Sequence, residues 1–268
     1  MMATLKKREA KDSRKRCRAW FCRSAIILLS FGILPCARPA ESASDRAHRL
    51  YVESRRLACA ETNNVAAACD FARACFDWAD FATNDTQRAA IAEEGIASSR
   101  RGIALAPASA CPRLYLGLNL GQLARTKLWG ALSLLDDMEA TWLKAIELDP
   151  KFNYAGAHRA VGLLYLEAPG WPISLGSHAK ARQHLKKAVE LSPDYPDNQL
   201  CWLEALLKWD EMKTVVAHTN TVEMVMTAAR SKFTGEEWKR DWEDWDDHWQ
   251  KIKAKVAAAR IRSARVSH

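Results

Sequence analysis

Residue types that commonly do chemistry are present in this chain, but their spacing does not assemble a catalytic set. Between residues 158 and 218 the histidines are His158, His178, His184 and His218, and none pairs with another on one helix face beside a carboxylate, as a metal-binding helix requires. Each is expected to be a surface or hydrogen-bonded residue. No Gly-x-Ser-x-Gly motif or glycine-rich phosphate loop occurs. We therefore predict no enzyme activity, no cofactor and no metal.

The cysteines also lack the spacing of a zinc site. Beyond residue 37 no Cys-x-x-Cys pair occurs, and the cysteines are Cys59, Cys69, Cys75, Cys111 and Cys201. Two alternatives stay open for them. Cys59 bonds to Cys69 or Cys75 across neighbouring helices, or the thiols are free and buried among alanines.

Composition and charge exclude several classes of protein. The chain has 268 residues, 49% of them apolar, with only 11 Gly and 9 Pro, which excludes disordered and collagen-like chains. The net charge of +8 is concentrated at the ends: residues 1–23 carry +7 and residues 250–268 carry +6, so residues 24–249 sum to −5. A negatively charged body predicts no nucleic-acid partner.

The N-terminal segment has the order of a secretory signal. The basic stretch is followed by the apolar run Ala25–Leu34 and then by Pro35, Cys36 and Ala37. A run of ten is short for a membrane span, which takes about 20 residues. We predict a signal peptide over residues 1–37 and a periplasmic or exported protein, with two alternatives for membrane anchoring: lipidation of Cys36 or an uncleaved signal.

An internal repeat predicts the fold. Three segments of the pattern small-apolar-x-apolar-x-Pro end at Pro107, Pro150 and Pro193, 43 residues apart. The second helix of a tetratricopeptide unit ends in this way, because the small residue admits a neighbouring helix and the proline stops the chain. The stretch Val161–Tyr165 fits the first helix of such a unit. We predict an all-α, tetratricopeptide-like α-solenoid of antiparallel helix pairs.

Apolar residues at three- and four-residue spacing place most of the remaining helices. They are expected at Arg46–Ala60, Asn64–Ala82, Asp85–Leu105, Pro196–Trp209 and Glu211–Arg230. The helical domain is predicted to span residues 38–249. A basic C-terminal tail follows over residues 250–268, either as a solvated helix end or as a segment attracted to anionic lipid or an acidic partner.

A stripe of tryptophans marks the last helix, which is expected to open with a capping box at Thr234–Glu237. The stripe consists of Trp238, Trp242, Trp245 and Trp249. We predict that it faces inward and caps the open end of the solenoid, with an oligomer interface or a ligand cage as alternatives. The acids between them are expected to face outward: Asp241, Glu243, Asp244, Asp246 and Asp247.

One part of the chain resembles a known family. From Ala140 to about Lys208 the repeat is interrupted by the insertion Ala168-Pro169-Gly170-Trp171-Pro172. This stretch resembles the T-component of TRAP transporters, the TatT-like family of periplasmic tetratricopeptide proteins. The insertion is the specific part of the resemblance, since the helix motifs are shared with many tetratricopeptide proteins.

The resemblance implies an exported helper for solute uptake that associates with a substrate-binding protein, binds a small organic anion and assembles as a trimer. It also implies a channel lined from the first helices of the repeats, which Asn119, Arg159, Tyr165 and Trp171 would face. Arg159 would hold a carboxylate, or else pair on the surface with Glu147 or Glu167. The alternative function is a general tetratricopeptide scaffold that assembles proteins in the cell envelope.

Overall fold

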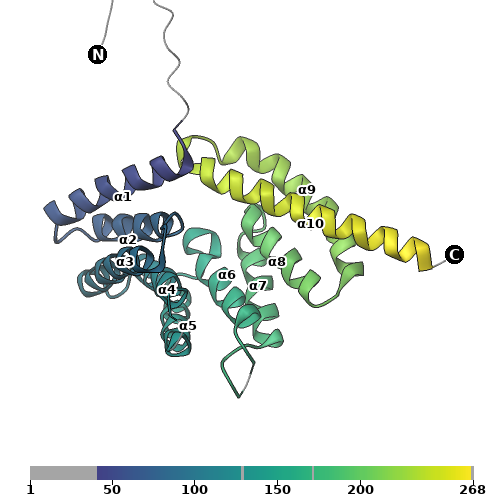
Figure 1. The fold of residues 1–268 in the computed structure, drawn as a ribbon, viewed down its shortest axis with the longest axis horizontal. Helices are drawn as coiled ribbons and strands as arrows, with labels where there is room; N and C mark the ends of the chain where they lie inside the picture. The colour runs from purple at the N-terminus through teal and green to yellow at the C-terminus, as the bar shows by residue number, and fades with distance from the viewer. Residues whose placement is uncertain (1–40, 128–129, 171, 267–268) are drawn as a thin grey trace, which may run out of the picture. The chain divides into compact units, whose positions relative to one another are not determined.

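The computed structural model describes residues 41–127, 130–170 and 172–266, with side chains up to residue 259. The predicted signal peptide, Cys36 and Trp171 lie outside these residues. Within them the chain forms ten α-helices and one short 3-10 helix (Figure 1). The helices are α1 (Ala43–Ala60), α2 (Val65–Ala79), α3 (Asp85–Leu105), α4 (Ala110–Ala124), α5 (Ala131–Leu148), α6 (Phe152–Glu167), α7 (His178–Leu191), α8 (Pro196–Lys208), α9 (Met212–Lys232), η1 (Glu236–Trp238) and α10 (Lys239–Val266).

Successive helices pack as pairs, which confirms the predicted all-α, tetratricopeptide-like solenoid. The pairs are α2 with α3, α4 with α5, α6 with α7, and α8 with α9, while α1 packs on α2 and α10 packs on α8 and α9 (Figure 1). The proline pattern correctly predicted the helix ends, since α3, α5 and α7 each end two residues before a repeat proline. Among the described helices, none combines the length and apolarity needed to cross a membrane.

Close approach within the pairs depends on the small residues of the repeat. A Cβ atom at Gly117 in α4 would lie 2.3 Å from the indole nitrogen of Trp142 in α5. A Cβ atom at Gly162 in α6 would lie 2.7 Å from the Leu185 side chain in α7. Both distances are far inside van der Waals contact, so each glycine sets how closely its pair packs.

The tryptophan helix caps the last core, as predicted. Trp245 and Trp249 are buried with Phe233, and the partly buried Trp238 and Trp242 pack against the same cluster. The predicted start of the helix is wrong. Gly235 has a φ of 101°, residues Glu236–Trp238 form a 3-10 turn, and α10 begins only at Lys239.

Helix α10 continues without a break through residue 249, the predicted end of the helical domain. Ile252 and Val256 are buried in the same cluster as Trp249. The apolar side of the helix therefore extends two turns into the stretch assigned to the basic tail.

The first turn of α6 has an unusual backbone. Asn153, Tyr154 and Ala155 all have φ between 50° and 60°, the left-handed region that side-chain-bearing residues rarely adopt. Tyr154 stacks on Tyr195 with ring centroids 4.4 Å apart. The turn therefore brings this aromatic ring against the start of α8.

Candidate ligand-binding cavity

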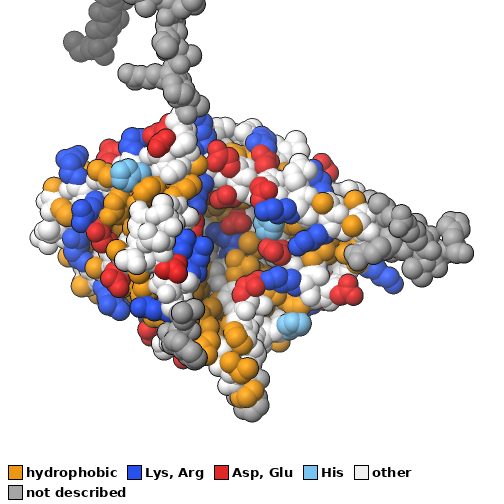
Figure 2. All heavy atoms as spheres, viewed as in Figure 1, with side chains coloured by type: hydrophobic (Ala, Val, Ile, Leu, Met, Phe, Trp, Pro, Cys, Tyr) orange, Lys and Arg blue, Asp and Glu red, His pale blue; other side chains and the backbone are white. Residues whose placement is uncertain are grey.

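A cavity of about 760 Å³ lies on the side of the solenoid formed by the first helix of each pair. Its walls come from α2, α4, α6 and the start of α8, and none of its lining residues belongs to α3, α5, α7 or α9. α1 supplies one further wall, and η1 with the beginning of α10 supplies another. Figure 2 shows this hollow bordered by acidic and basic side chains. The concave face is therefore bounded by helices from both ends of the described chain.

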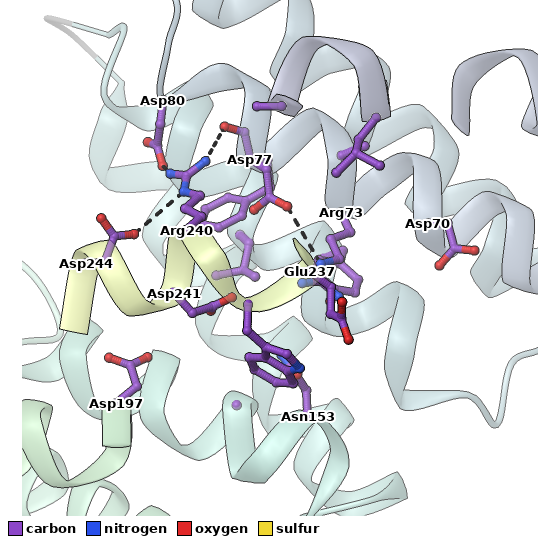
Figure 3. A pocket seen from close by; sticks show the side chains of 18 of the residues that line it. Asp70, Arg73, Asp77, Asp80, Asn153, Asp197, Glu237, Arg240, Asp241 and Asp244 are labelled. Atoms are coloured by element: carbon purple, nitrogen blue, oxygen red, sulfur yellow. Dashed lines mark hydrogen bonds and ion pairs between the residues drawn. The ribbon is translucent and has the colours of Figure 1, made fainter. Parts of the chain in front are cut away.

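Arg240 of α10 ties the last helix to α2 across the cavity (Figure 3). Its guanidinium donates to the backbone oxygen of Asp77 at 2.7 Å and to Oδ2 of Asp80 at 2.6 Å, and it lies 3.6 Å from Oδ2 of Asp244. Burial alone would lower the pKa of Arg240, but these carboxylates raise it above its usual value. The guanidinium therefore stays charged and is already occupied by protein partners.

Arg159 of α6 lines the same cavity and is also paired. Its Nε lies 2.8 Å from Oδ2 of Asp197, and its Nη1 donates to Oδ1 of Asn198 at 2.8 Å. The guanidinium lies over the Tyr195 ring, 5.2 Å from its centroid. Although burial favours a lower pKa, Asp197 raises the pKa of Arg159. The expected surface pairing with Glu147 or Glu167 is wrong, since the partner comes from α8.

Asp241 is the carboxylate that burial affects most clearly. Its pKa is raised to about 6: burial is the largest cause, Arg73 opposes it, and the nearby carboxylates of Asp77, Asp197 and Asp244 add to it. No hydrogen bond or ion pair to Asp241 exists within the described part of the chain. Figure 3 shows Asp241 among the other carboxylates of the cavity. The prediction that Asp241 faces outward is wrong, because Asp241 lines the cavity, whereas the Asp244 side chain is 71% exposed, as predicted.

Two tyrosine hydroxyls in the cavity wall are also without hydrogen-bond partners. Tyr195 and Tyr115 line the cavity and are only 4% and 7% exposed. Neither hydroxyl makes a hydrogen bond to any residue that the structure describes. Burial raises the pKa of both, so both stay protonated at neutral pH. Neither hydroxyl oxygen is among the fully buried atoms without a partner, so both are open to the space of the cavity.

Asn119 and Tyr165, also predicted to face a channel, do not line this cavity. Asn119 is completely buried, and its Nδ2 donates to the backbone oxygens of Ala72 and Tyr115. Tyr165 points to the other side of α6, where its hydroxyl donates to Glu139. Of the predicted set, the cavity therefore includes Arg159, and a ligand-binding role for any member stays a prediction.

Tyr165 instead lies beside two histidines that come close together, although the sequence analysis expected each histidine to be isolated. The Nδ1 atoms of His158 in α6 and His184 in α7 lie 3.0 Å apart. Burial, followed by the neighbouring His184, lowers the pKa of His158 to about 4. Burial and Lys180 lower the pKa of His184 as well. No group of three metal-ligating side chains occurs among the described residues.

The disulfide differs from the pairing expected for Cys59, while the alternative of free buried thiols is confirmed for Cys75 and Cys201. Cys69 of α2 forms a disulfide with Cys111 of α4, with Cα atoms 6.2 Å apart. Cys59 is an exposed free thiol, while Cys75 and Cys201 are free and buried. The bond joins the first helices of adjacent pairs, α2 and α4, which pack against each other.

The sequence reasoning missed most of the cavity's charged residues. Asp70, Arg73, Asp77 and Asp80 follow one another at spacings of three, four and three on α2 and its C-cap, and all four line the cavity. A charged stripe on a helix otherwise rich in alanine and phenylalanine was the available signal. It indicated a polar concave surface.

Comparison with known proteins supports the fold and goes no further. No family profile and no curated protein sequence matches this chain. A solved structure of TTC0263, a thermophilic TPR protein of Thermus thermophilus, superposes with a TM-score of 0.54 at 15% identity, covering 82% of this chain and 97% of that one. A structure of MamA gives a TM-score of 0.46 at 15% identity over 71% of this chain and 98% of that one. The likeness to TTC0263 shows a shared tetratricopeptide-like architecture.

Proposed function

We propose that this protein is a tetratricopeptide-type scaffold that binds a segment of a partner protein in the cavity of its concave face. The observation that carries this proposal is that all lining residues outside the two end walls come from the first helices of the repeats. A helical repeat stacks such helices into an extended concave binding surface. The cavity volume suits a short segment or a few side chains and is too small for a folded domain.

An exposed apolar wall supports a protein partner. Leu50 and Leu57 of α1 line the cavity one heptad apart and are 43% and 38% exposed. Large aliphatic side chains that stay accessible in a concave site are typical of interaction surfaces. They offer a partner the apolar contact that the charged wall does not.

Site-specific photo-crosslinking tests the proposal. A photoreactive amino acid at Leu50 lies in the cavity, whereas one at Lys186 on α7 lies on an exposed position outside it. We expect a discrete adduct with a partner protein in cells from position 50 and none from position 186. Equal adducts from both positions, or none from position 50, would contradict binding in the cavity.

An exported location is part of the proposal. It is supported by the signal-like order of residues 1–37 and is compatible with the Cys69–Cys111 disulfide, since such bonds persist in oxidising compartments. Fractionation of cells carrying the full chain tests it, with recovery in the cytosolic fraction as the contrary result. The trimer implied by the family resemblance stays a prediction.

The uptake role implied by the resemblance has one observation in its favour, the position of Arg159 in the cavity wall. The pairing of Arg159 with Asp197 and the surrounding carboxylates weigh against capture of an organic anion. Calorimetric titration with small mono- and dicarboxylates compares the two functions. Binding that is lost in Arg159→Ala would favour uptake, and absence of binding favours the scaffold.

A further inference from the structure

The chemistry of the cavity wall identifies the kind of partner segment it fits. Nine carboxylates and four arginines line the cavity. The arginines are engaged: Arg159 and Arg240 pair with carboxylates as described above, Arg73 lies 3.7 Å from Asp77, and Arg46 donates to the backbone oxygen of Glu236. The cavity therefore has an excess of negative charge that its own arginines do not neutralise.

Four of the lining carboxylates make no hydrogen bond or ion pair with any described residue: Glu53, Asp70, Glu237 and Asp241. They come from α1, α2, η1 and α10, so they surround the space from several sides. Asp70, Glu237 and Asp241 are visible in Figure 3 without partners. A cation entering this space would meet unpaired carboxylates from several helices.

Two tyrosine hydroxyls offer a polar ligand further hydrogen-bonding groups in the cavity. Tyr195 and Tyr115 are more than nine-tenths buried, line the cavity, and have hydroxyls without hydrogen bonds to the described protein. A guanidinium or ammonium group is a pure donor, so it can satisfy a tyrosine oxygen and a carboxylate at the same time. A carboxylate ligand would satisfy the hydroxyls but would be repelled by the surrounding acids.

The cavity also has aliphatic lining residues, which a ligand can contact through apolar groups. On α1 the cavity-facing residues include Ala43, Ala47, Leu50 and Leu57, which follow helical spacing. Leu163 of α6 lines the same space. Aliphatic side chains of α1 and α6 therefore line the same cavity as the acidic side chains of α2 and α10.

We propose that the occupant of this cavity is a basic, amphipathic segment of a partner protein, with arginine or lysine side chains directed at Asp241 and Asp70 and aliphatic side chains packed on Leu50. This inference rests on the proposed function and specifies the chemistry of the partner. Charge complementarity carries it, since the donor-only cations of such a segment match the unpaired acceptors of the cavity.

Fluorescence anisotropy with three synthetic peptides tests the proposal on the purified full-length chain. The probe is a labelled 14-residue helix-forming peptide of leucine and arginine at amphipathic spacing, and its matched forms carry glutamine or glutamate in place of arginine. We expect the arginine peptide to bind, the glutamine peptide to bind more weakly and the glutamate peptide not to bind. Equal or tighter binding of the glutamate peptide would overturn the proposal.

Matched variants separate the cavity from general electrostatic attraction. The double variant Asp70→Asn/Asp241→Asn is expected to weaken binding of the arginine peptide by about tenfold or more. The control Asp136→Asn/Asp137→Asn changes the net charge equally on positions of α5 outside the cavity, and should leave the affinity nearly unchanged. Equal weakening by both doubles would show that no specific site exists. Thermal unfolding of each variant confirms that it is folded.

The outcomes also separate this inference from the proposed function. Crosslinking at Leu50 to a partner whose captured segment is neutral or acidic would leave the scaffold function standing and overturn the basic-segment inference. Failure of cavity crosslinking together with failure of the peptides to bind would overturn both.

Discussion

Arg240 and Asp80 form an ion pair of 2.6 Å although 160 residues separate them in the sequence. Asp80 is the C-cap residue of α2, and it also accepts from Gln122 and Arg125 at the end of α4. One carboxylate therefore joins the last helix of the chain to the first two repeats. This relationship gives the cavity its wall between α2 and α10.

Loss of this junction should destabilise the protein measurably. Arg240→Ala removes hydrogen bonds to Asp77 and Asp80 at a mostly buried site, with an expected cost of about 2–3 kcal/mol in the free energy of unfolding. Arg230→Ala is the matched control, because Arg230 forms an exposed pair with Asp246, and its loss should cost about 1 kcal/mol or less. Urea unfolding measures both. Equal effects would mean that the α2–α10 junction is no stronger than a surface pair.

Two glycines of α4 should respond oppositely to alanine. Gly117→Ala places a methyl group 2.3 Å from Trp142 and should cost about 1–3 kcal/mol through overpacking. Gly121→Ala meets only the end of the Met138 side chain at 3.3 Å, so it should be neutral or stabilise the helix by up to about 1 kcal/mol. The difference is read from thermal unfolding midpoints. A stable Gly117→Ala protein would contradict the close α4–α5 packing.

Removal of the Cys69–Cys111 disulfide should lower stability without abolishing the fold. The bond closes a loop with a sequence separation of 42 residues, and the chain-entropy relation gives about 4 kcal/mol for such a loop. Denaturant unfolding of the double variant Cys69→Ser/Cys111→Ser against the parent chain measures the loss. A thiol titration in denaturant, before and after reduction, should differ by two thiols, and no difference would contradict the disulfide.

Asp241 should make the protein less stable as the pH rises through weakly acidic values. Its pKa is about 6 in the folded protein against 3.8 ordinarily, so the folded state holds the proton more tightly. The stabilising protonation is complete below about pH 4 and lost by about pH 6. Asp241→Asn should therefore stabilise the protein at pH 7, on the order of 2 kcal/mol, and remove this part of the pH dependence. Urea unfolding from pH 4 to 7 tests the sign.

The His158–His184 pair should make the protein less stable as the pH falls, over a similar pH range. The pKa of His158 falls from 6.5 to about 4, so the folded state resists the proton that the unfolded chain accepts. The pair's contribution is complete above pH 6.5 and is lost as the pH falls toward 4, on the order of 2–3 kcal/mol. His158→Gln should flatten this acid sensitivity, while His218→Gln on α9 should not. If the unfolding free energy depended on pH equally in both variants, the histidine pair would not be the source of the acid sensitivity.

The local sequence pattern was enough to predict which helices form pairs. It did not predict which residues of non-consecutive helices come into contact. The prolines at 107, 150 and 193 fix where helices end, and they do so through steric effects within one turn. Cys69 meets Cys111 because α2 packs on α4, which skips the intervening helix α3. Such a contact depends on the superhelical path of the repeats, and no short spacing in the sequence encodes it.

The same reason explains the mixed result for the candidate site. Arg159 was found because it lies on a first helix, where the repeat places concave residues. Asp241 was expected outside because the tryptophan stripe was assumed to be the only inward side of the last helix. In the structure α10 packs on α8 and α9, and its Arg240 also pairs with Asp80 at the end of α2, so the neighbouring Asp241 lines the cavity.

The contacts between α1, α2 and the η1–α10 region also change how the chain should fold. A repeat solenoid with only nearest-neighbour interfaces can unravel unit by unit from either end. Here Arg46 of α1 donates to the backbone of Glu236, and Arg240 of α10 holds α2, so both ends are tied to each other. Fraying of one end therefore removes interactions of the other. The described chain should therefore unfold in one cooperative transition and not unit by unit.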